Sequence, residues 1–136
     1  MAIAETTDTT TILNKAIKKF TTDLAAGSGQ DTTSWICPNG VTSVNYLVVA
    51  GGGSGGEFNG GGGGSGGLLQ GTIAVLPGTS YDIKIGTGGY GVSSPGPGVN
   101  GSNSQFFTVI TTGGGGGQVL TGTFEAVGKM WVRVKV

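Results

Sequence analysis

Four glycine-rich tracts constrain this chain more than any other feature of its sequence. Glycine supplies 31 of the 136 residues, and most of these lie in Gly51–Gly56, Gly60–Gly67, Gly113–Gly117 and the looser GTGGYG of residues 86–91. Ordering a glycine costs about 0.5–1 kcal/mol more than ordering an alanine. The tracts are therefore either flexible linkers or segments whose close backbone packing compensates for this cost.

We favour ordered tracts, because Phe58, Asn59 and Tyr90 interrupt them and because they follow predicted strands within one sheet pattern. Without a Cβ on any side, extended segments can approach until N–H and C=O groups bond between them. Such packing has a polyproline-II-like or sheet arrangement.

Apolar residues alternate with polar ones in the segments between the tracts, which is the period of a half-buried strand. The predicted strands are residues 44–50, 69–75, 81–85, 105–112, 119–127 and 129–136. Pro77 and Gly78 form a turn pair, which predicts a hairpin between the second and third of these strands. Short strands joined by glycine-rich turns predict an all-β fold, an antiparallel β-sandwich of jelly-roll type with glycine-rich loops.

The N-terminal segment has a different period. Apolar residues recur at helical spacing within residues 8–25, namely Leu13, Ile17, Phe20 and Leu24, and Gly27 and Gly29 follow. We expect a short amphipathic helix that packs on its own sheet or against copies of itself. The predicted domains are an assembly segment over residues 1–32 and a glycine-rich β-sandwich over residues 33–136.

Composition removes several classes of function. Seven basic residues balance seven acidic ones, so we expect neither nucleic acid nor an anionic membrane as a partner. The absence of His and the single Cys exclude the usual catalytic triads and His-ligated metal sites. Cys37 is expected to be a small buried apolar residue. We therefore expect a non-enzymatic protein without a metal or other cofactor and without a membrane-spanning segment.

Two enzyme-like patterns are also weak. GTGGYG runs into Val92–Pro95, which cannot begin the helix that a dinucleotide-binding motif needs. The acidic residues Glu57, Asp82 and Glu125 are isolated in sequence, so a glycosidase carboxylate pair has no support from their spacing.

Aromatic and amide side chains within the glycine-rich loops are the candidate binding residues. The set is Phe58, Asn59, Tyr90, Asn100 and Asn103. Aromatic rings and carboxamides together suit stacking on a sugar and hydrogen bonding to it. The alternative is that the two rings fold back over the glycine layers or pack against a neighbouring copy.

The succession of these elements resembles the glycine-rich domain of bacteriophage tail fibres and related virion proteins. The resemblance covers roughly residues 33–117 and is carried by WICPNGVT, VVAGGGSGG, LPGTSYDIKIGTGGYG, NGSNSQF and TTGGGGG. Trp35, Pro38 and Gly40 match the start of the family's first core strand, while Gly51–Gly53 and Gly113–Gly117 match its glycine blocks. The resemblance implies a β-sandwich, a structural role in a phage, multimeric presentation and host-surface adhesion, with no catalytic residue.

Two functions follow from this resemblance as expectations. The first is a short tail-fibre or tip protein, attached by its N-terminal helix without a shaft, that contacts a bacterial surface glycan through loops 54–67 and 86–104. The second is a capsid decoration or cement protein that binds no receptor. Both place the chain on the virion surface after synthesis in the host cytoplasm, with other virion proteins as partners and a homotrimer as the expected assembly.

Overall fold

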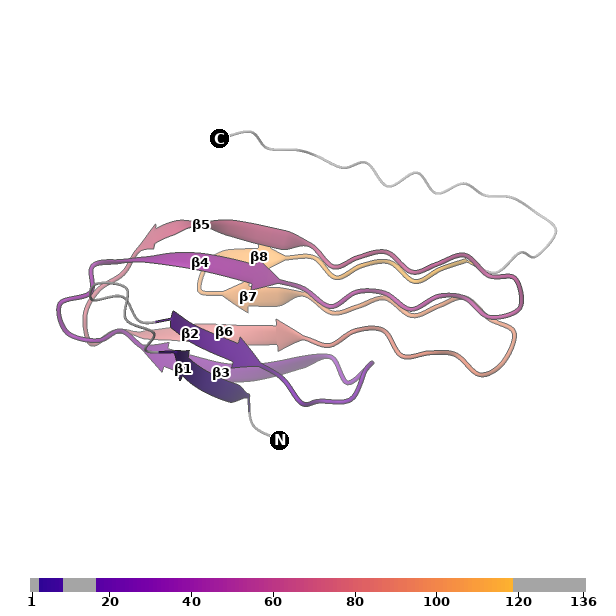
Figure 1. Ribbon diagram of the computed structural model, residues 1–136, viewed down its shortest axis with the longest axis horizontal. Helices are drawn as coiled ribbons and strands as arrows, with labels where there is room; N and C mark the ends of the chain where they lie inside the picture. Colours follow the sequence, from indigo (N-terminus) through magenta and orange to yellow (C-terminus); the bar gives the residue numbers. More distant parts are fainter. Residues whose placement is uncertain (1–2, 9–16, 119–136) are drawn as a thin grey trace.

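The computed structural model describes residues 3–8 and 17–118, and in these residues the fold is all-β with antiparallel strand pairs. The strands are β1 (Ala4–Asp8), β2 (Ile17–Thr21), β3 (Gln30–Ile36), β4 (Ser43–Val49), β5 (Leu68–Ala74), β6 (Ser80–Gly86), β7 (Ser104–Phe106) and β8 (Val109–Thr111). Strands β3–β8 lie at one end of an elongated body, and the glycine-rich segments run side by side beyond them (Figure 1). No helix in this part of the chain has the length and apolar run needed to cross a membrane.

The strands of the body form two sheets. One has the order β3-β6-β7-β8, and the other pairs β4 with β5. Strand β4 contacts β7 and β8, and β5 contacts β8, so the smaller sheet lies against one side of the larger. The expectation of an antiparallel all-β fold is confirmed.

The core is small and lies between the two sheets. Cys37, Val75 and Tyr81 are its buried centre, with partly buried Trp35 and Phe106 packed against it. The ring centroids of Trp35 and Tyr81 are 6.0 Å apart, within the range of favourable aromatic pairs. Cys37 is 1% exposed and its Sγ lies 3.4 Å from the carbonyl oxygen of Val41, which confirms that it is a small buried residue.

The predicted hairpin at Pro77–Gly78 is wrong. Strand β5 pairs with β4, whereas β6 pairs with β3, so the turn carries the chain from one sheet to the other. The crossing is held by a 2.8 Å hydrogen bond from the Leu76 N–H to the Tyr81 hydroxyl. A proline followed by a glycine with φ of 75° suits this turn as well as it suits a hairpin.

The predicted strand over residues 105–112 is two short strands. Strands β7 and β8 are separated by a turn of Phe107 and Thr108. Phe107 has a φ of 51°, and its ring packs edge-on against Tyr81 with 5.1 Å between centroids. The predicted strands over residues 119–127 and 129–136 lie outside the described residues. Strand β3 was not among the predicted strands, because its QDTTSWI sequence has few apolar residues.

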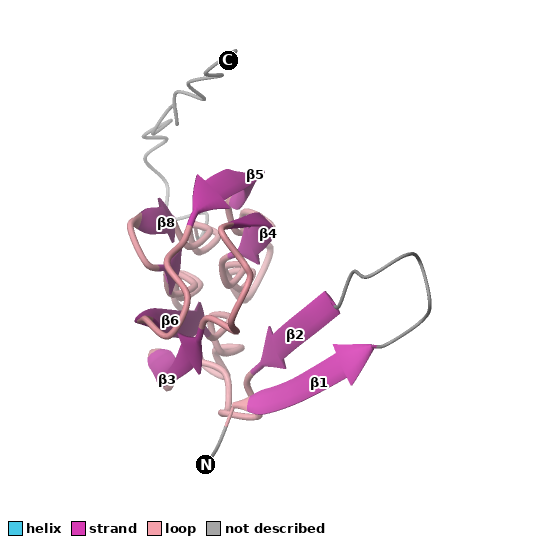
Figure 2. Cartoon of the chain, turned by 90° about the vertical axis from the view of Figure 1, so that its left-hand side faces the viewer, coloured by secondary structure: helices cyan, strands magenta, loops and turns pink. Residues whose placement is uncertain are grey.

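The N-terminal helix is not found in the described residues. Ile17 and Phe20 lie in strand β2, which pairs with β1 in a two-stranded sheet, and Leu24 lies in irregular chain. Leu13 lies outside the described residues. The physical reason is local: the Thr residues that flank the apolar positions have low helix propensity and favour strands. This hairpin projects from the body (Figure 2).

Candidate functional site

Five glycine-rich segments continue beyond the strands and form one hydrogen-bonded unit, which we call the glycine bundle. Its segments are residues 50–57, 60–67, 87–91, 96–102 and 112–118. Backbone bonds between these segments replace the ladder bonds of a sheet, as we expected for ordered tracts. Residues 27–29 join the bundle through the Gly27 N–H, which donates to the Gly88 oxygen at 2.7 Å, and the Thr87 N–H, which donates to the Gly29 oxygen at 2.9 Å.

The bonds repeat every third residue. In segment 60–67, the N–H groups of Gly61, Gly64 and Gly67 donate to the oxygens of residues 118, 115 and 112 at 2.8, 2.7 and 2.8 Å. The carbonyl oxygens of the same three glycines accept from the N–H groups of residues 56, 53 and 50 at 3.0, 2.8 and 2.9 Å. A three-residue repeat whose hydrogen bonds all run between segments is the geometry of polyproline II.

Many of the tract glycines are required for space, and none of them for unusual backbone angles. The described glycines with positive φ are Gly27, Gly29, Gly40 and Gly78, none of which is in the four tracts. A Cβ on Gly114 would come closer than 3.0 Å to the Gly64 carbonyl, and a Cβ on Gly117 would do the same at Gly61. Because these obstacles are backbone atoms, no rotamer change can relieve them.

Buried hydroxyl groups mark the junction between the strands and the glycine bundle. Thr87 donates to the Gly29 oxygen at 3.0 Å, Ser104 accepts from the Gly86 N–H at 2.9 Å and Thr111 donates to the Ser104 oxygen at 3.2 Å. All three side chains are hydrogen-bonded, as buried polar groups need to be. The Thr87 bond holds the first residue of a bundle segment, and the Ser104 and Thr111 bonds hold the ends of β6, β7 and β8 together where the bundle begins.

The turn at residues 57–60 joins two bundle segments at the end far from the strands. Phe58 and Asn59 have φ of 49° and 59°, and two successive residues of positive φ are typical of a type I′ turn. Asn tolerates this region, whereas an aromatic residue rarely occupies it. The Phe58 side chain is 68% exposed, and no aromatic ring contact involves it among the described residues.

A second loop lies beside this turn. The Glu57 N–H donates to the Gly96 oxygen at 3.3 Å, which connects the turn to the loop of residues 92–97. Ser93, Ser94 and Pro95 are exposed in that loop. We call Phe58, Asn59 and residues 93–95 the tip surface; it combines one aromatic ring with a carboxamide and two hydroxyl groups.

The other three predicted binding residues do not join the tip surface. The carboxamide oxygen of Asn100 accepts from the Gly116 N–H at 2.7 Å, and that of Asn103 accepts from the Gly113 N–H at 2.9 Å. Both amides therefore satisfy the backbone of the bundle along its flank. The Tyr90 ring lies against Gly27, where a Cβ would collide with it. The Tyr90 ring thus packs over a glycine, as in the alternative interpretation of the aromatic loop residues, although the ring stays half exposed.

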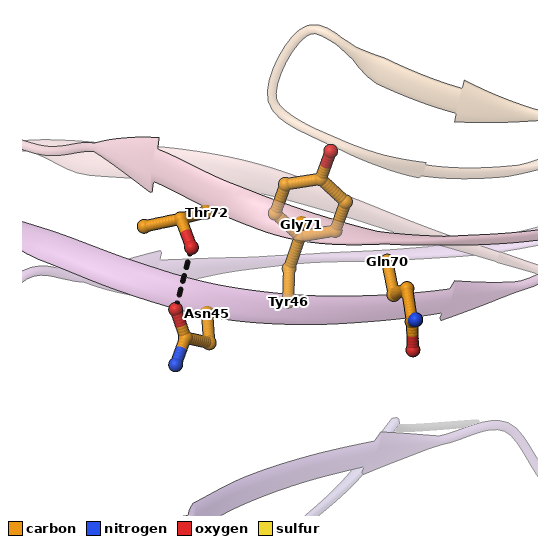
Figure 3. Close-up of a pocket in the computed structure, with 5 residues that line it drawn as sticks. All are labelled: Asn45, Tyr46, Gln70, Gly71 and Thr72. Carbon is orange, nitrogen blue, oxygen red and sulfur yellow. Dashed lines mark hydrogen bonds between the residues drawn. The ribbon is translucent and has the colours of Figure 1, made fainter. Parts of the chain in front are cut away.

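A shallow pocket of about 390 Å³ opens on the β4–β5 sheet. It is lined by Asn45, Tyr46, Gln70, Gly71 and Thr72 (Figure 3). Tyr46 lies opposite Gly71 across the strands and its ring covers the glycine, while the Thr72 hydroxyl donates to the Asn45 carboxamide oxygen at 2.7 Å. The polar residues on the outward face of the two strands were a signal for this pocket that sequence reasoning did not use.

The structure brings no acidic cluster together in the part of the chain that it describes. Glu57 lies at the far turn of the bundle and Asp82 lies within β6, so the length of the bundle separates them. The described residues contain no group of three or more Cys, Asp or Glu side chains able to hold a metal ion. Glu57 Oε2 is covered and lacks a hydrogen-bond partner among these residues.

The feature that sequence reasoning missed is the three-residue repeat of the hydrogen bonds between glycine-rich segments. Its signal is a glycine at every third position where segments approach most closely, as in Gly86 and Gly89, Gly98 and Gly101, and Gly113 and Gly116. Asn100 and Asn103 have the same spacing, which explains why both reach equivalent N–H groups of one neighbouring segment.

Comparison with known proteins gives one match. The sequence model of a family described as a glycine-rich domain matches residues 27–130. Neither the curated proteins nor the solved structures contain a match to the chain.

Proposed function

The chain belongs to the glycine-rich domain family, and on that premise we propose that it is a non-enzymatic bacteriophage virion protein whose tip surface adheres to a glycan of the host cell. In this proposal the two sheets form a β-sandwich of jelly-roll type that holds the glycine bundle outward. The virion context comes from the resemblance to tail-fibre domains.

The observation that carries the adhesive part is the conformation and exposure of Phe58. A left-handed backbone at an aromatic residue costs on the order of 1 kcal/mol, and such strain clusters at functional sites. Its ring is largely exposed, so packing does not offset this cost within the described residues. An exposed ring on a fixed backbone, beside carboxamide and hydroxyl groups, suits the apolar face and the hydroxyls of a sugar.

The hydrogen bonding of the glycine bundle, which carries the turn of residues 57–60, also favours adhesion through the tip surface. The turn is the end of a bundle whose segments are bonded at every third residue, so the backbone that carries its two exposed side chains is held in place before a ligand arrives. Pre-ordering reduces the entropy lost on binding. Several copies on one particle would turn weak single contacts into firm attachment.

The projecting β1–β2 hairpin supports attachment to a particle or to sister subunits. An isolated two-stranded hairpin is marginal in water, and this one has no extensive contact with the other described strands. Its Ile17 side chain is exposed. We therefore propose that this hairpin, in place of the expected helix, holds the trimer and its virion partners together.

Binding to a panel of immobilised bacterial surface polysaccharides tests the adhesive function. Phe58→Ala should lower binding at least tenfold, because it removes the ring and leaves the bundle intact. Gln70→Ala, which changes the pocket on the β4–β5 sheet, is the matched control and should bind as the original chain does. Loss of binding in the control alone would assign adhesion to that pocket.

A capsid cement protein remains the second proposal, since a projecting hairpin serves equally to join neighbouring subunits. Electron microscopy of the particle with this chain labelled separates the two. A few copies at the tail tip support adhesion, whereas copies at regular positions over the head support cementing.

A further inference from the structure

Three Asn–Gly pairs occur in the chain, at Asn39–Gly40, Asn59–Gly60 and Asn100–Gly101. In such a pair the backbone nitrogen of the glycine can attack the carboxamide carbon of the asparagine, Cγ, and close a five-membered ring. A glycine favours this reaction because it has no Cβ to obstruct the approach. By sequence alone the three pairs are equally open to it.

Solvent exposure does not separate the pairs. Asn39, Asn59 and Asn100 are all exposed. To close the ring, however, the asparagine side chain and the peptide bond that follows it must turn toward each other. The rate therefore depends on the hydrogen bonds that hold the carboxamide and the glycine N–H in other positions.

At Asn100 both reacting groups are held by the glycine bundle. The Asn100 carboxamide oxygen accepts from the Gly116 N–H at 2.7 Å, and the Gly101 N–H donates to the Gly114 oxygen at 2.8 Å. Both partners belong to bundle segment 112–118. Ring closure at Asn100 would require this segment to separate from its neighbour, so the pair is protected.

At Asn59 neither reacting group is held. Among the described residues, no hydrogen bond involves the Asn59 carboxamide or the Gly60 N–H. The turn is closed by the Gly56 N–H, which donates to the Gly61 oxygen at 3.0 Å, outside the two residues that react. The strained backbone of Phe58 lowers the cost of rearranging this turn.

We propose that Asn59 is a modification site of the tip surface, where it deamidates spontaneously through a succinimide formed with Gly60, and that Asn100 is protected. A bond forms between the Gly60 nitrogen and Asn59 Cγ, the Cγ–Nδ2 bond breaks, and ammonia leaves with the proton of the Gly60 N–H. Water then opens the ring at either of its carbonyl groups and leaves aspartate or isoaspartate. Water is consumed and ammonia released, with no change in oxidation state.

The modification changes the chemistry of the tip surface. Both products place a carboxylate in the turn that already contains Glu57. The N–H donors of the Asn59 carboxamide are lost, because a carboxylate only accepts hydrogen bonds. If isoaspartate forms, the side-chain methylene also enters the main chain and lengthens the turn. A consequence that rests on the proposed function is that affinity for a glycan falls as the protein ages.

Peptide mapping by mass spectrometry tests the site itself. The full chain is aged in mildly alkaline buffer, and aspartate plus isoaspartate is measured at each of the three pairs. Asn59 should react at least about tenfold faster than Asn100, because fewer bonds oppose ring closure there. Asn39, in the turn between β3 and β4 at the opposite end of the body (Figure 1), gives the rate of a second exposed turn.

The same measurement on the chain unfolded in urea is the control. There Asn59 and Asn100 should react at similar rates, since the bundle no longer protects Asn100. Equal rates at Asn59 and Asn100 in the folded chain would overturn the proposal, whatever the rate at Asn39. A difference that persists in urea would also contradict it, because flanking residues and not the bundle would then set the rates.

Polysaccharide binding tests the consequence separately. Asn59→Asp, which is identical to one product, should bind more weakly than the original chain, whereas Asn39→Asp, far from the tip surface, should bind equally well. Unchanged binding by Asn59→Asp would overturn the effect of ageing on adhesion. The mapping experiment needs no glycan, so failure of the proposed function leaves its outcome intact.

Discussion

Gly114 and Gly62 have the same side chain and belong to the same bundle, yet their surroundings differ completely. Gly114 is buried, and the backbone of Gly64 occupies the space where its Cβ would lie. Gly62 is exposed and has nothing within 4 Å of the same position. The two residues separate the requirement for close backbone approach from glycine content as such.

Gly114→Ala should therefore destabilise the protein, and Gly62→Ala should not. Overpacking against fixed backbone typically costs 1–3 kcal/mol, so we expect Gly114→Ala to lower Tm by roughly 5–15 °C. Gly62→Ala should leave Tm unchanged or raise it slightly, because alanine restricts the unfolded chain. Thermal unfolding followed by circular dichroism measures both. Equal losses in the two variants would mean that backbone contact is not what the tracts supply.

Asn100 and Asn103 provide a second contrast, between hydrogen bonding and ligand binding. Their carboxamide oxygens accept from bundle N–H groups, so Asn100→Ala and Asn103→Ala should each cost about 1 kcal/mol. Asn→Asp at either position keeps the acceptor oxygen and should preserve most of the stability. Glycan binding should be retained in Asn100→Asp and Asn103→Asp. If both aspartate variants fold normally and lose binding, the flank of the bundle takes part in the site.

In the described residues, two turns place a phenylalanine in the left-handed region, and they differ in what surrounds the ring. Phe107 joins β7 to β8 and packs on Tyr81, which offsets the cost of its backbone conformation. Phe58 joins two bundle segments and exposes its ring. The first turn thus uses its aromatic residue for stability, and the second is the candidate for function.

Replacement of each phenylalanine by glycine should change stability in opposite directions. Phe58→Gly relieves a strained backbone at an exposed position, so Tm should rise by a few degrees, corresponding to about 1 kcal/mol. Phe107→Gly also relieves strain but removes the contact with Tyr81, and Tm should fall. Polysaccharide binding should be lost in Phe58→Gly despite its greater stability. A lower Tm in Phe58→Gly would show that the ring has a packing role after all.

Local sequence patterns predicted where the strands of the body lie better than they predicted which strands pair with each other. The alternation in residues 44–50, 69–75 and 81–85 placed β4, β5 and β6 to within one residue at each end, because each has one face toward the core. Pairing depends on where the chain crosses between sheets, and Pro77–Gly78 suits both a hairpin and a crossing. Residues 8–25 satisfied a helical spacing, yet Ile17–Thr21 within them form a strand, since four apolar residues do not overcome threonine's preference for strands.

The candidate site was predictable only in part, for a similar reason. Phe58 and Asn59 stood out because no core periodicity accounts for them, and the structure leaves both exposed at a turn. Asn100 and Asn103 stood out equally, but their partners are N–H groups of residues sixteen and ten positions away, in another segment. Contacts between distant backbone segments leave little local trace in a sequence.

At the scale of the whole molecule, the described residues form a small core, a long glycine bundle that extends from it and a hairpin that projects from it. Most of the described glycine segments are stabilised by one another and by the junction hydroxyls, not by apolar burial. The hairpin is connected to the body through residues 22–29, where the Thr22 hydroxyl donates to Asp31 at 3.0 Å. Assembly and body stability should therefore be separable.

Deletion of residues 1–21 tests this separation. The full chain should have about three times the 13.4 kDa mass of one chain in solution, and the shortened chain should be a monomer. Its Tm should fall little, because the hairpin has no extensive contact with the other described strands and the bonds of residues 22–29 remain. Light scattering after size exclusion gives the mass, and calorimetry at matched concentration gives the Tm. A shortened chain that keeps the full mass would move the interface to the sheets or the bundle, whereas a monomer that has lost its cooperative transition would show that the body depends on assembly to fold.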